Sequence, residues 1–278
     1  MQLDKETEVE IFKRASLCRA FEEEVYRQVQ SGNVKIPVYL SAGQEYTSAS
    51  LSVLLEKFGI TDRQIFIQHR GHSTYLSFGG DLEQLVLELL GKKLGCSGGM
   101  GGSASIQSKQ QQIYGHDGLM GSQGPIATGM CFANKKLTLC FSGDAAAEED
   151  YFLASIGWAS TKSLPLWFII EDNNLSILTE KKVRRNWEMH DIATAFKMKA
   201  VDITSRPSDI WSSIDSDDFR KPILLNVNVN RLFWHAGAGI DDPSLPDIHK
   251  EYVEKFGEEI VRDSERIVKG VWEKCLKL

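Results

Sequence analysis

Two apolar runs near the middle of the chain end at oxygen-bearing side chains, and about one helix length separates them. The runs are "KLTLCFS", which Asp144 follows after one glycine, and "LPLWFII", which leads into "EDNN". The segment between them, "AAAEEDYFLASIGWASTK", has the length and composition of a helix. We therefore predict strand, helix and strand over residues 137–171, joined by a right-handed crossover that makes the two strands parallel.

The polar residues at the two strand ends are candidates for a cation site. The carboxyl ends of parallel strands lie on the same edge of a sheet, where ligands of open α/β sheets bind. Asp144 offers a carboxylate and Asn173 an amide oxygen, which are ligands suited to magnesium or calcium. Gly143 and the three alanines after Asp144 would let the backbone approach phosphate groups. The residues alone equally allow an ordinary turn and a loop that binds nothing, because Asp and Asn are common in loops.

The rest of the chain alternates between helical and strand-like patterns, which favours an α/β fold with a mostly parallel sheet. The Gly- and Ser-rich stretch 95–106 interrupts this pattern and predicts a long loop. We expect helices over 5–31, 41–58, 81–93 and 119–134, and one long amphipathic helix over 246–278. Strands are expected within 63–72, 196–203 and 222–230, with the segment 207–216 between the last two.

Composition and length limit the class of protein. The 278 residues show no repeat and no clear linker, so we predict a single domain over 1–278 with helical extensions at both ends. A formal net charge of −6 argues against nucleic acid as the main partner, and no apolar run approaches the roughly 20 residues of a membrane helix. The only dense basic run, Glu180–Trp187, is most simply interpreted as a solvated loop face. The N-terminus has no visible targeting signal and the five cysteines are widely spaced, so we expect reduced thiols and a cytoplasmic location.

Several segments, in order along the chain, resemble one enzyme family. The stretch "GDAAAEEDYFLASIGWASTKSLPLWFIIEDNN" resembles the thiamine-diphosphate motif, which begins GDG and ends NN about thirty residues later. The other segments are "SAGQEY", "HRGH", "LGKKLGCSGGMGGSASI", "YGHDGLMGSQGPIATGM" and "PILLNVNVNRLFWHAG". Together they cover roughly 15–239 and resemble the alpha subunit of pyruvate-dehydrogenase-type 2-oxo acid dehydrogenases. The resemblance implies a thiamine-diphosphate-binding α/β fold, with a mostly parallel central sheet flanked by helices on both faces.

The resemblance also implies roles for particular residues. It makes Asp144, Asn173 and the backbone carbonyl of Leu175 the ligands of Mg²⁺. It makes His235 a catalytic and cofactor-binding residue, and we add His72 as a second catalytic candidate. Ordinary packing of His235 in an aromatic turn, or of His72 in a loop, remains an alternative. The other cofactor-binding residues that it implies are His69, Arg70, Gly118, Met120, Gly143, Ala145 and Ala146.

The chain departs from the family pattern at three positions. Ala145 replaces the second glycine of GDG and adds a methyl group, which is tolerated if its φ is negative. Ser105 stands where the family has a histidine. Ala236 replaces the serine that is phosphorylated in mitochondrial relatives, so that switch is absent.

The implied activity is the decarboxylation of a 2-oxo acid and transfer of the remaining unit to a lipoyl carrier or to another carbonyl. The family takes an essential glutamate from a beta-type subunit, so we expect half of an active site and an α2β2 tetramer. A split transketolase-like or carboligating enzyme and a non-catalytic scaffold subunit are the alternatives. A nicotinamide-dependent dehydrogenase would need GxGxxG at a first strand–helix turn, and we find none.

Overall fold

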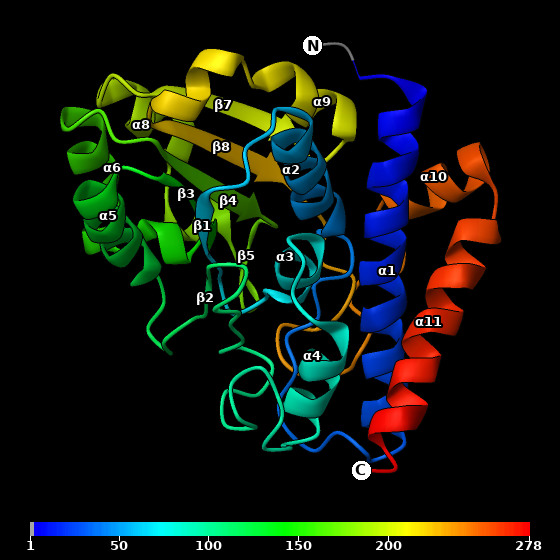
Figure 1. Cartoon of the computed structure of the whole chain (residues 1–278). Coiled ribbons are helices and arrows are strands. Elements are labelled where there is room, and N and C mark those ends of the chain that lie inside the picture. Colours follow the sequence, from blue (N-terminus) through cyan, green and yellow to red (C-terminus); the bar gives the residue numbers. More distant parts are fainter. Residues whose placement is uncertain (1–2) are drawn as a thin grey trace.

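The computed structural model describes residues 3–278 and is built around one six-stranded parallel sheet (Figure 1). Its strands are β1 (Arg63–Phe66), β2 (Ile113–Tyr114), β3 (Leu137–Gly143), β4 (Leu166–Asp172), β7 (Lys199–Thr204) and β8 (Ile223–Asn228). Their order across the sheet is β2-β1-β3-β4-β8-β7. A separate antiparallel pair, β5 (Leu175–Ser176) and β6 (Thr179–Glu180), follows β4 directly.

Helices connect the strands and cover the sheet. They are α1 (Lys5–Gln30), α2 (Glu45–Lys57), α3 (His72–Ser77), α4 (Leu82–Leu89), α5 (Gln123–Asn134), α6 (Asp150–Thr161), α7 (Lys181–Arg184), α8 (Met189–Ala195), α9 (Pro207–Ser213), α10 (Ile248–Phe256) and α11 (Glu259–Cys275). Two 3₁₀ turns cover Ala146–Glu148 and Ser216–Arg220. Asp4 caps α1 and Asp81 caps α4, each accepting a backbone N–H of the first turn.

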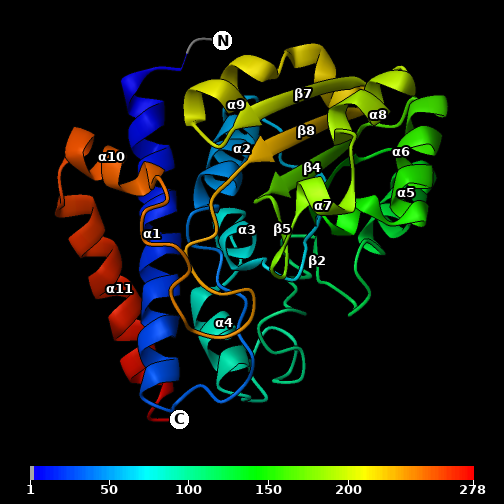
Figure 2. The same cartoon turned by 180° about the vertical axis from the view of Figure 1, so that it is seen from behind.

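The sheet separates two apolar layers because successive strand residues point to opposite faces. In β3, Leu139 and Phe141 pack with α1, α2 and α9, whereas Cys140 packs with α5, α6 and α8. Figures 1 and 2 show α5 and α6 at one end of the molecule and α1 and α11 at the other. The predicted α/β fold, with a parallel sheet between two helical layers, is therefore confirmed.

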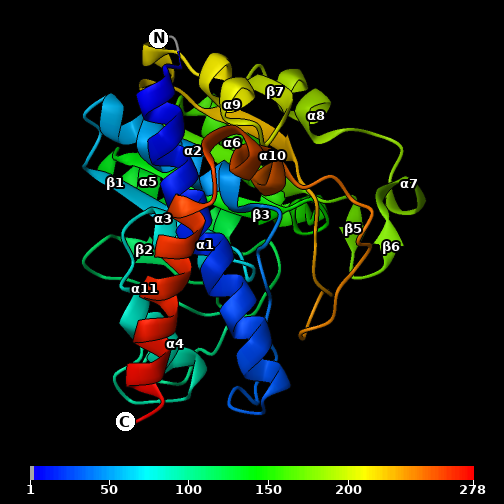
Figure 3. The ribbon, with the colours of Figure 1, turned by 90° about the vertical axis from the view of Figure 1, so that its right-hand side faces the viewer.

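The last predicted helix is wrong in one respect, because the structure has two helices there. Gly257 has φ +86 and ends α10, and α11 then begins at Glu259. Such a positive φ favours glycine, which has no Cβ to clash with the backbone. Figure 3 shows α11 lying along α1, with α10 turned away from it. Among residues 3–278, the structure has no helix long and apolar enough to cross a membrane.

Candidate functional site

The carboxyl ends of β1, β3 and β4 meet at one edge of the sheet. Gly143 of β3 pairs with Glu171 of β4, so Asp144 and Asn173 leave neighbouring parallel strands on the same side. The crossover through α6 thus brings together two residues that are far apart in the sequence, as predicted from the two apolar runs. The chain after β1 contributes His69 and Arg70 to the same edge.

A cavity of about 290 Å³ opens at this edge. Ten of the twelve residues singled out from the sequence line it: His69, Arg70, Met120, Gly143, Asp144, Ala145, Ala146, Asn173, Leu175 and His235. Four other residues complete the lining: Gln68, Glu149, Ser176 and Ile177. We call this space the edge cavity. These four belong to the same chain segments as the predicted residues, but no motif marks them individually.

The remaining two residues lie outside the lining of the edge cavity. His72 is fully buried at the start of α3, where its Nδ1 lies 3.1 Å from Glu22 and its Nε2 lies 2.9 Å from the Ser103 hydroxyl. Both ring nitrogens thus have partners in the core. Gly118 lies before α5 with φ +100, a conformation that favours glycine.

Asp144 is 1% exposed and makes an ion pair with Arg184. Burial raises the pKa of its carboxyl above the usual range, and the nearby Asp172 carboxylate adds to this, against the guanidinium of Arg184. Its carbonyl oxygen accepts a hydrogen bond from Arg185. The interpretation of Glu180–Trp187 as a solvated face is therefore wrong for two residues. The Lys182 side chain is 77% exposed, but the side chains of Arg184 and Arg185 are 12% and 1% exposed.

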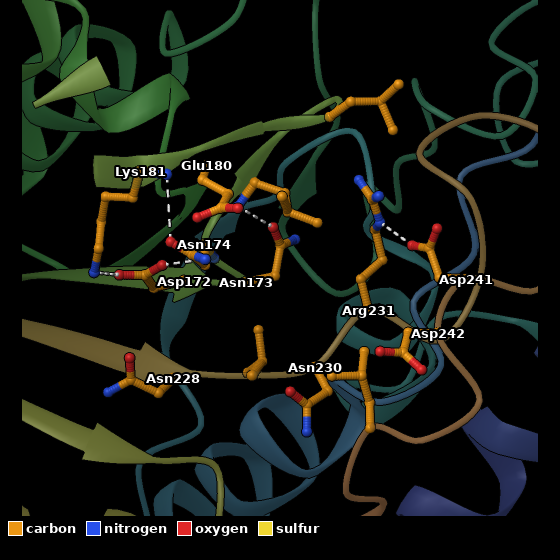
Figure 4. Close-up of a pocket in the computed structure, with 14 residues that line it drawn as sticks. Asp172, Asn173, Asn174, Glu180, Lys181, Asn228, Asn230, Arg231, Asp241 and Asp242 are labelled. Carbon is orange, nitrogen blue, oxygen red and sulfur yellow. Dashed lines mark hydrogen bonds and ion pairs between the residues drawn. The ribbon is translucent and has the colours of Figure 1, made fainter. Parts of the chain in front are cut away.

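Asn173 lies between the edge cavity and a second, larger cavity of about 640 Å³. Its Oδ1 accepts a hydrogen bond from the backbone N–H of Leu175 at 3.0 Å. Figure 4 shows the second cavity, where Lys181 reaches Asp172 and Arg231 reaches Asp241. The second lone pair of the Asn173 amide oxygen can still accept a further ligand.

Aromatic and basic side chains form the opposite side of the edge cavity. The ring centroids of His69 and His235 are 5.5 Å apart, and Tyr39 packs edge-on against both. Burial lowers the pKa of His69 to about 2, with the Arg70 guanidinium adding to the effect. The pKa of His235 is lowered by the same two causes. Both imidazoles are therefore neutral at pH 7.

Arg70 holds this side of the cavity together. It is 3% exposed and donates hydrogen bonds to the backbone oxygens of Leu40 and His235, at 2.8 and 3.1 Å. Through these two bonds Arg70 links the loop that carries His235 to the segment at Leu40. The family resemblance implies that Arg70 binds the cofactor, and the structure adds this contact to the His235 backbone.

The Gly-rich stretch 95–106 surrounds a carboxylate of the chain itself. Glu88 is fully buried and its two oxygens accept backbone N–H groups of four residues: Ser97, Gly99, Gly101 and Gly102. The stretch is therefore a structural turn wrapped around Glu88. Its N–H groups already have an anionic partner, which leaves no reason to assign it a phosphate.

The oxygen donors at the edge cavity suit a divalent cation that also binds a diphosphate. Asp144, Asn173 and Leu175 line one space and offer a carboxylate, an amide and a backbone carbonyl. Among residues 3–278, the structure has no group of three or more His, Cys, Asp or Glu residues that could hold a metal ion. Ala145 has φ −73, so its methyl group causes no backbone strain there. The backbone at Gly143 is also accessible, because a Cβ there would meet only Gln68 Oε1, at 3.4 Å.

Comparisons with known proteins agree with this geometry. The family model described as "Dehydrogenase E1 component" matches residues 13–206. The alpha subunit of the pyruvate dehydrogenase E1 component of Rickettsia prowazekii is 28% identical over 270 residues, which cover 91% of this chain and 79% of that protein. The alpha subunit of acetoin:2,6-dichlorophenolindophenol oxidoreductase of Cupriavidus necator is 31% identical over 186 residues, covering 65% of this chain and 55% of that protein.

A solved structure extends the likeness to the whole fold. Transketolase from Campylobacter jejuni superimposes with a TM-score of 0.59 at 14% identity over 99% of this chain. This chain spans about half of that transketolase, 49% of its length. Because the family model covers most of the chain, the protein belongs to the family of dehydrogenase E1 components, as an alpha-subunit-type, thiamine-diphosphate-dependent enzyme of the 2-oxo acid dehydrogenase class.

Proposed function

We propose that the chain is the alpha subunit of an enzyme that uses thiamine diphosphate and Mg²⁺ to decarboxylate a pyruvate-like 2-oxo acid and transfer the remaining unit. One observation carries this proposal. Ten residues singled out from the sequence, drawn from segments 69–70, 120, 143–146, 173–175 and 235, line a single cavity. An accidental cluster of loop residues would not be expected to bring all of these segments to one place.

In this proposal, Asp144, Asn173 and the carbonyl of Leu175 hold Mg²⁺, and the backbone at Gly143 and Ala145 lies along the diphosphate. Thiamine diphosphate, when bound, would supply a nucleophilic carbon for the substrate ketone and an electron sink for decarboxylation. The chain positions the reactants and provides a polar, partly dry environment. Met120, which is 38% exposed and lines the edge cavity, would contact the rings of the cofactor.

His235 would interact with the substrate or the diphosphate as a neutral imidazole. Its backbone is fixed by Arg70 and its ring by Tyr39, so its position is set before any ligand binds. A neutral imidazole donates one hydrogen bond and accepts another. It can therefore polarise a carbonyl, or receive a proton, near neutral pH.

The proposal includes a beta-type partner subunit, assembly as α2β2 and a cytoplasmic location. A surface on α5 and α6 supports the partner, because it exposes three large apolar residues: Ile126 (49%), Phe132 (45%) and Trp158 (41%). Between the helices lies a groove with the small residues Gly129 and Ala154. We call this surface the α5/α6 face. It adjoins the edge cavity, because the Tyr151 hydroxyl in α6 donates to the backbone oxygen of Met120. A subunit bound there would lie beside the proposed cofactor.

The acceptor of the transferred unit is a lipoyl carrier in our first proposal. The relative named for acetoin favours a second candidate, in which a carbonyl compound of that kind is the substrate or product. Paired assays would separate the two, with pyruvate and a lipoyl domain in one and acetoin or an aldehyde acceptor in the other. Release of carbon dioxide that depends on the lipoyl domain would support the first.

The first experiment is calorimetric titration with thiamine diphosphate and Mg²⁺, on the chain alone and with its beta-type partner. We expect Mg²⁺-dependent binding by the wild type, and Asp144→Asn to weaken it by more than about 100-fold, because a metal ligand is lost. The matched control is Asp150→Asn, which removes an exposed carboxylate at the start of α6 and should leave binding unchanged.

Two results would contradict the proposal. No binding of the cofactor, even with the partner present, would favour a scaffold subunit. Turnover of a 2-oxo acid at full rate by the chain alone would show that no second subunit completes the site.

A further inference from the structure

Two arginines that belong to none of the sequence motifs contact Asp144, the residue directly after β3. Arg184 pairs through its Nη2 with Oδ2 of Asp144, and its Nη2 also lies 3.2 Å from Glu148. Arg185 donates from Nη1 to the backbone oxygen of Asp144 at 3.4 Å, and the same atom lies 3.3 Å from Glu148. We call Arg184 and Arg185 the arginine pair. Arg184 is the last residue of α7 and Arg185 follows it; this short helix comes directly after the β5–β6 hairpin.

The contacts leave one oxygen of Asp144 free for another ligand. The hydrogen bond from Arg184 uses Oδ2, and among the residues that the structure describes no hydrogen bond reaches Oδ1. Asp144 also lines the edge cavity. A carboxylate that is held at one oxygen and available at the other is prepared to bind a cation in one orientation.

Acidic and basic side chains surround Asp144, and Lys181 also lies 3.0 Å from Glu188. Asp144, Glu148 and Asp172 face the arginine pair and Lys181, with Lys181 2.7 Å from Asp172 and Arg185 4.0 Å from it. The arginine pair is not fully satisfied, however. Within the described part of the chain, Nε and Nη1 of Arg184 and Nε and Nη2 of Arg185 are buried without a hydrogen-bond partner. A buried N–H group without a hydrogen-bond partner destabilises the fold, and an anion or ordered water would supply that partner.

We propose that Arg184 is a positioning residue for the metal–diphosphate ligand, acting through Asp144. It fixes the Asp144 carboxylate so that Oδ1 serves the cation, while Arg185 fixes the backbone of the same residue. Groups that orient a metal ligand in this way raise metal affinity about 10–100-fold. This inference rests on the proposed function.

A competing effect is repulsion between the guanidinium and Mg²⁺, which would weaken metal binding. The net charge of the ligand decides between the two effects. A diphosphate carries more negative charge than one divalent cation neutralises, so the bound pair is an anion and a nearby guanidinium attracts it. When the metal and thiamine diphosphate bind together, Arg184 therefore strengthens binding in two ways: it orients the Asp144 carboxylate and it attracts the bound anion.

The test compares Arg184→Gln, Arg184→Lys and Lys182→Gln in the holoenzyme with its partner subunit. Calorimetry gives the Mg²⁺ dissociation constant in the presence of thiamine diphosphate, and Mn²⁺ paramagnetic resonance reports the coordination of the metal. Lys182→Gln is the matched control, because it removes a positive charge from an exposed side chain of the same helix. Circular dichroism and denaturant unfolding without metal show that each variant is folded and how stable it is.

We expect Arg184→Gln to weaken Mg²⁺ binding about 10–100-fold. Arg184→Lys should recover part of the loss, since it keeps the charge but not the planar fork of the guanidinium. Lys182→Gln should bind like the wild type. A merely structural role would reduce unfolding stability but leave the Mn²⁺ spectrum of the bound metal unchanged.

Mg²⁺ binding by folded Arg184→Gln that is as tight as in the wild type, or tighter, would overturn the inference. The tighter result would identify Arg184 as a competitor of the metal. If the wild type itself showed no Mg²⁺-dependent binding of thiamine diphosphate, the proposed function would fail, and this inference with it.

Discussion

At the scale of single residues, burial affects the pKa of several histidines more than any neighbouring charge does. Desolvation is the largest cause of the lowered pKa at His69, His116, His235 and His249. Charged imidazoles would repel Arg70 at the edge cavity and Arg19 near His249. A neutral imidazole therefore avoids this repulsion both at His69, in the edge cavity, and at His249, in the core.

His249 gives a prediction on pH and stability. Burial lowers its pKa to about 3, against an ordinary value of 6.5, so between these values only the unfolded chain takes up the proton. Stability from this group is full above pH 6.5 and falls by about 1.4 kcal/mol per pH unit as the pH drops below it. His249→Asn can keep the contact to the Tyr46 hydroxyl, which lies 3.3 Å from Nδ1, but loses packing on Phe12.

We expect this variant to be less stable at pH 7.5 by about 1–2 kcal/mol, and to lose stability less steeply between pH 6.5 and 5. Urea denaturation at several pH values measures both quantities. His69 should contribute equally to the slope of stability against pH in the wild type and in the variant. The difference between the two slopes therefore reports on His249. An equal slope in wild type and variant would mean that His249 takes up a proton in the folded state.

At the scale of elements, the fold around Glu88 depends on one carboxylate. Replacing it with Gln would leave two of the four backbone N–H groups facing an amide NH₂ group that cannot accept them. We expect Glu88→Gln to lower the free energy of unfolding by roughly 2–5 kcal/mol. Glu83, on the same helix, is the control, because within residues 3–278 its partly exposed side chain pairs only with Lys274.

Glu83→Gln should change stability by less than about 0.5 kcal/mol. Thermal and urea unfolding of both variants checks the difference, and proteolysis shows whether the stretch 95–106 opens first. Equal stability of the two variants would show that the Gly-rich turn does not need its central carboxylate.

Elements with a strong apolar pattern could be predicted, and those set by distant contacts could not. The strands β3 and β4 are continuous apolar runs. Because a strand–helix–strand connection makes its strands parallel, Asp144 and Asn173 could be predicted to lie at one edge of the sheet. The strand β2 has two residues, and only its pairing with β1 defines it. The helix α7 is basic and short, so its sequence suggests a solvated loop. The side chains of Arg184, its last residue, and of Arg185, which follows it, are only 12% and 1% exposed because Asp144 and Glu148 face them. Those contacts depend on tertiary structure.

At the scale of the whole molecule, helices cover both faces of the parallel sheet, but the α5/α6 face leaves large apolar side chains exposed. Phe132 and Trp158 pack against each other at 4.8 Å between ring centroids, and each has a lysine over its ring. They nevertheless remain 45% and 41% exposed. Large apolar residues that gather at a surface commonly mark an interface. The start of α6 reaches the edge cavity through Tyr151, so a second subunit bound along this face could also complete an active site.

Phe132→Glu tests this surface against a matched position on the other side of the molecule. A carboxylate in a desolvated interface costs several kcal/mol, so we expect Phe132→Glu to weaken assembly with the beta-type partner by at least 100-fold. Ile267→Glu in α11 is the control, because Ile267 is 55% exposed on a helix that packs against α1, away from α5 and α6. Analytical ultracentrifugation over a range of concentrations measures the assembly, and circular dichroism of each chain alone confirms folding. If Ile267→Glu disrupted assembly and Phe132→Glu did not, the partner would have to bind the α1/α11 side, and the edge cavity would need another means of closure.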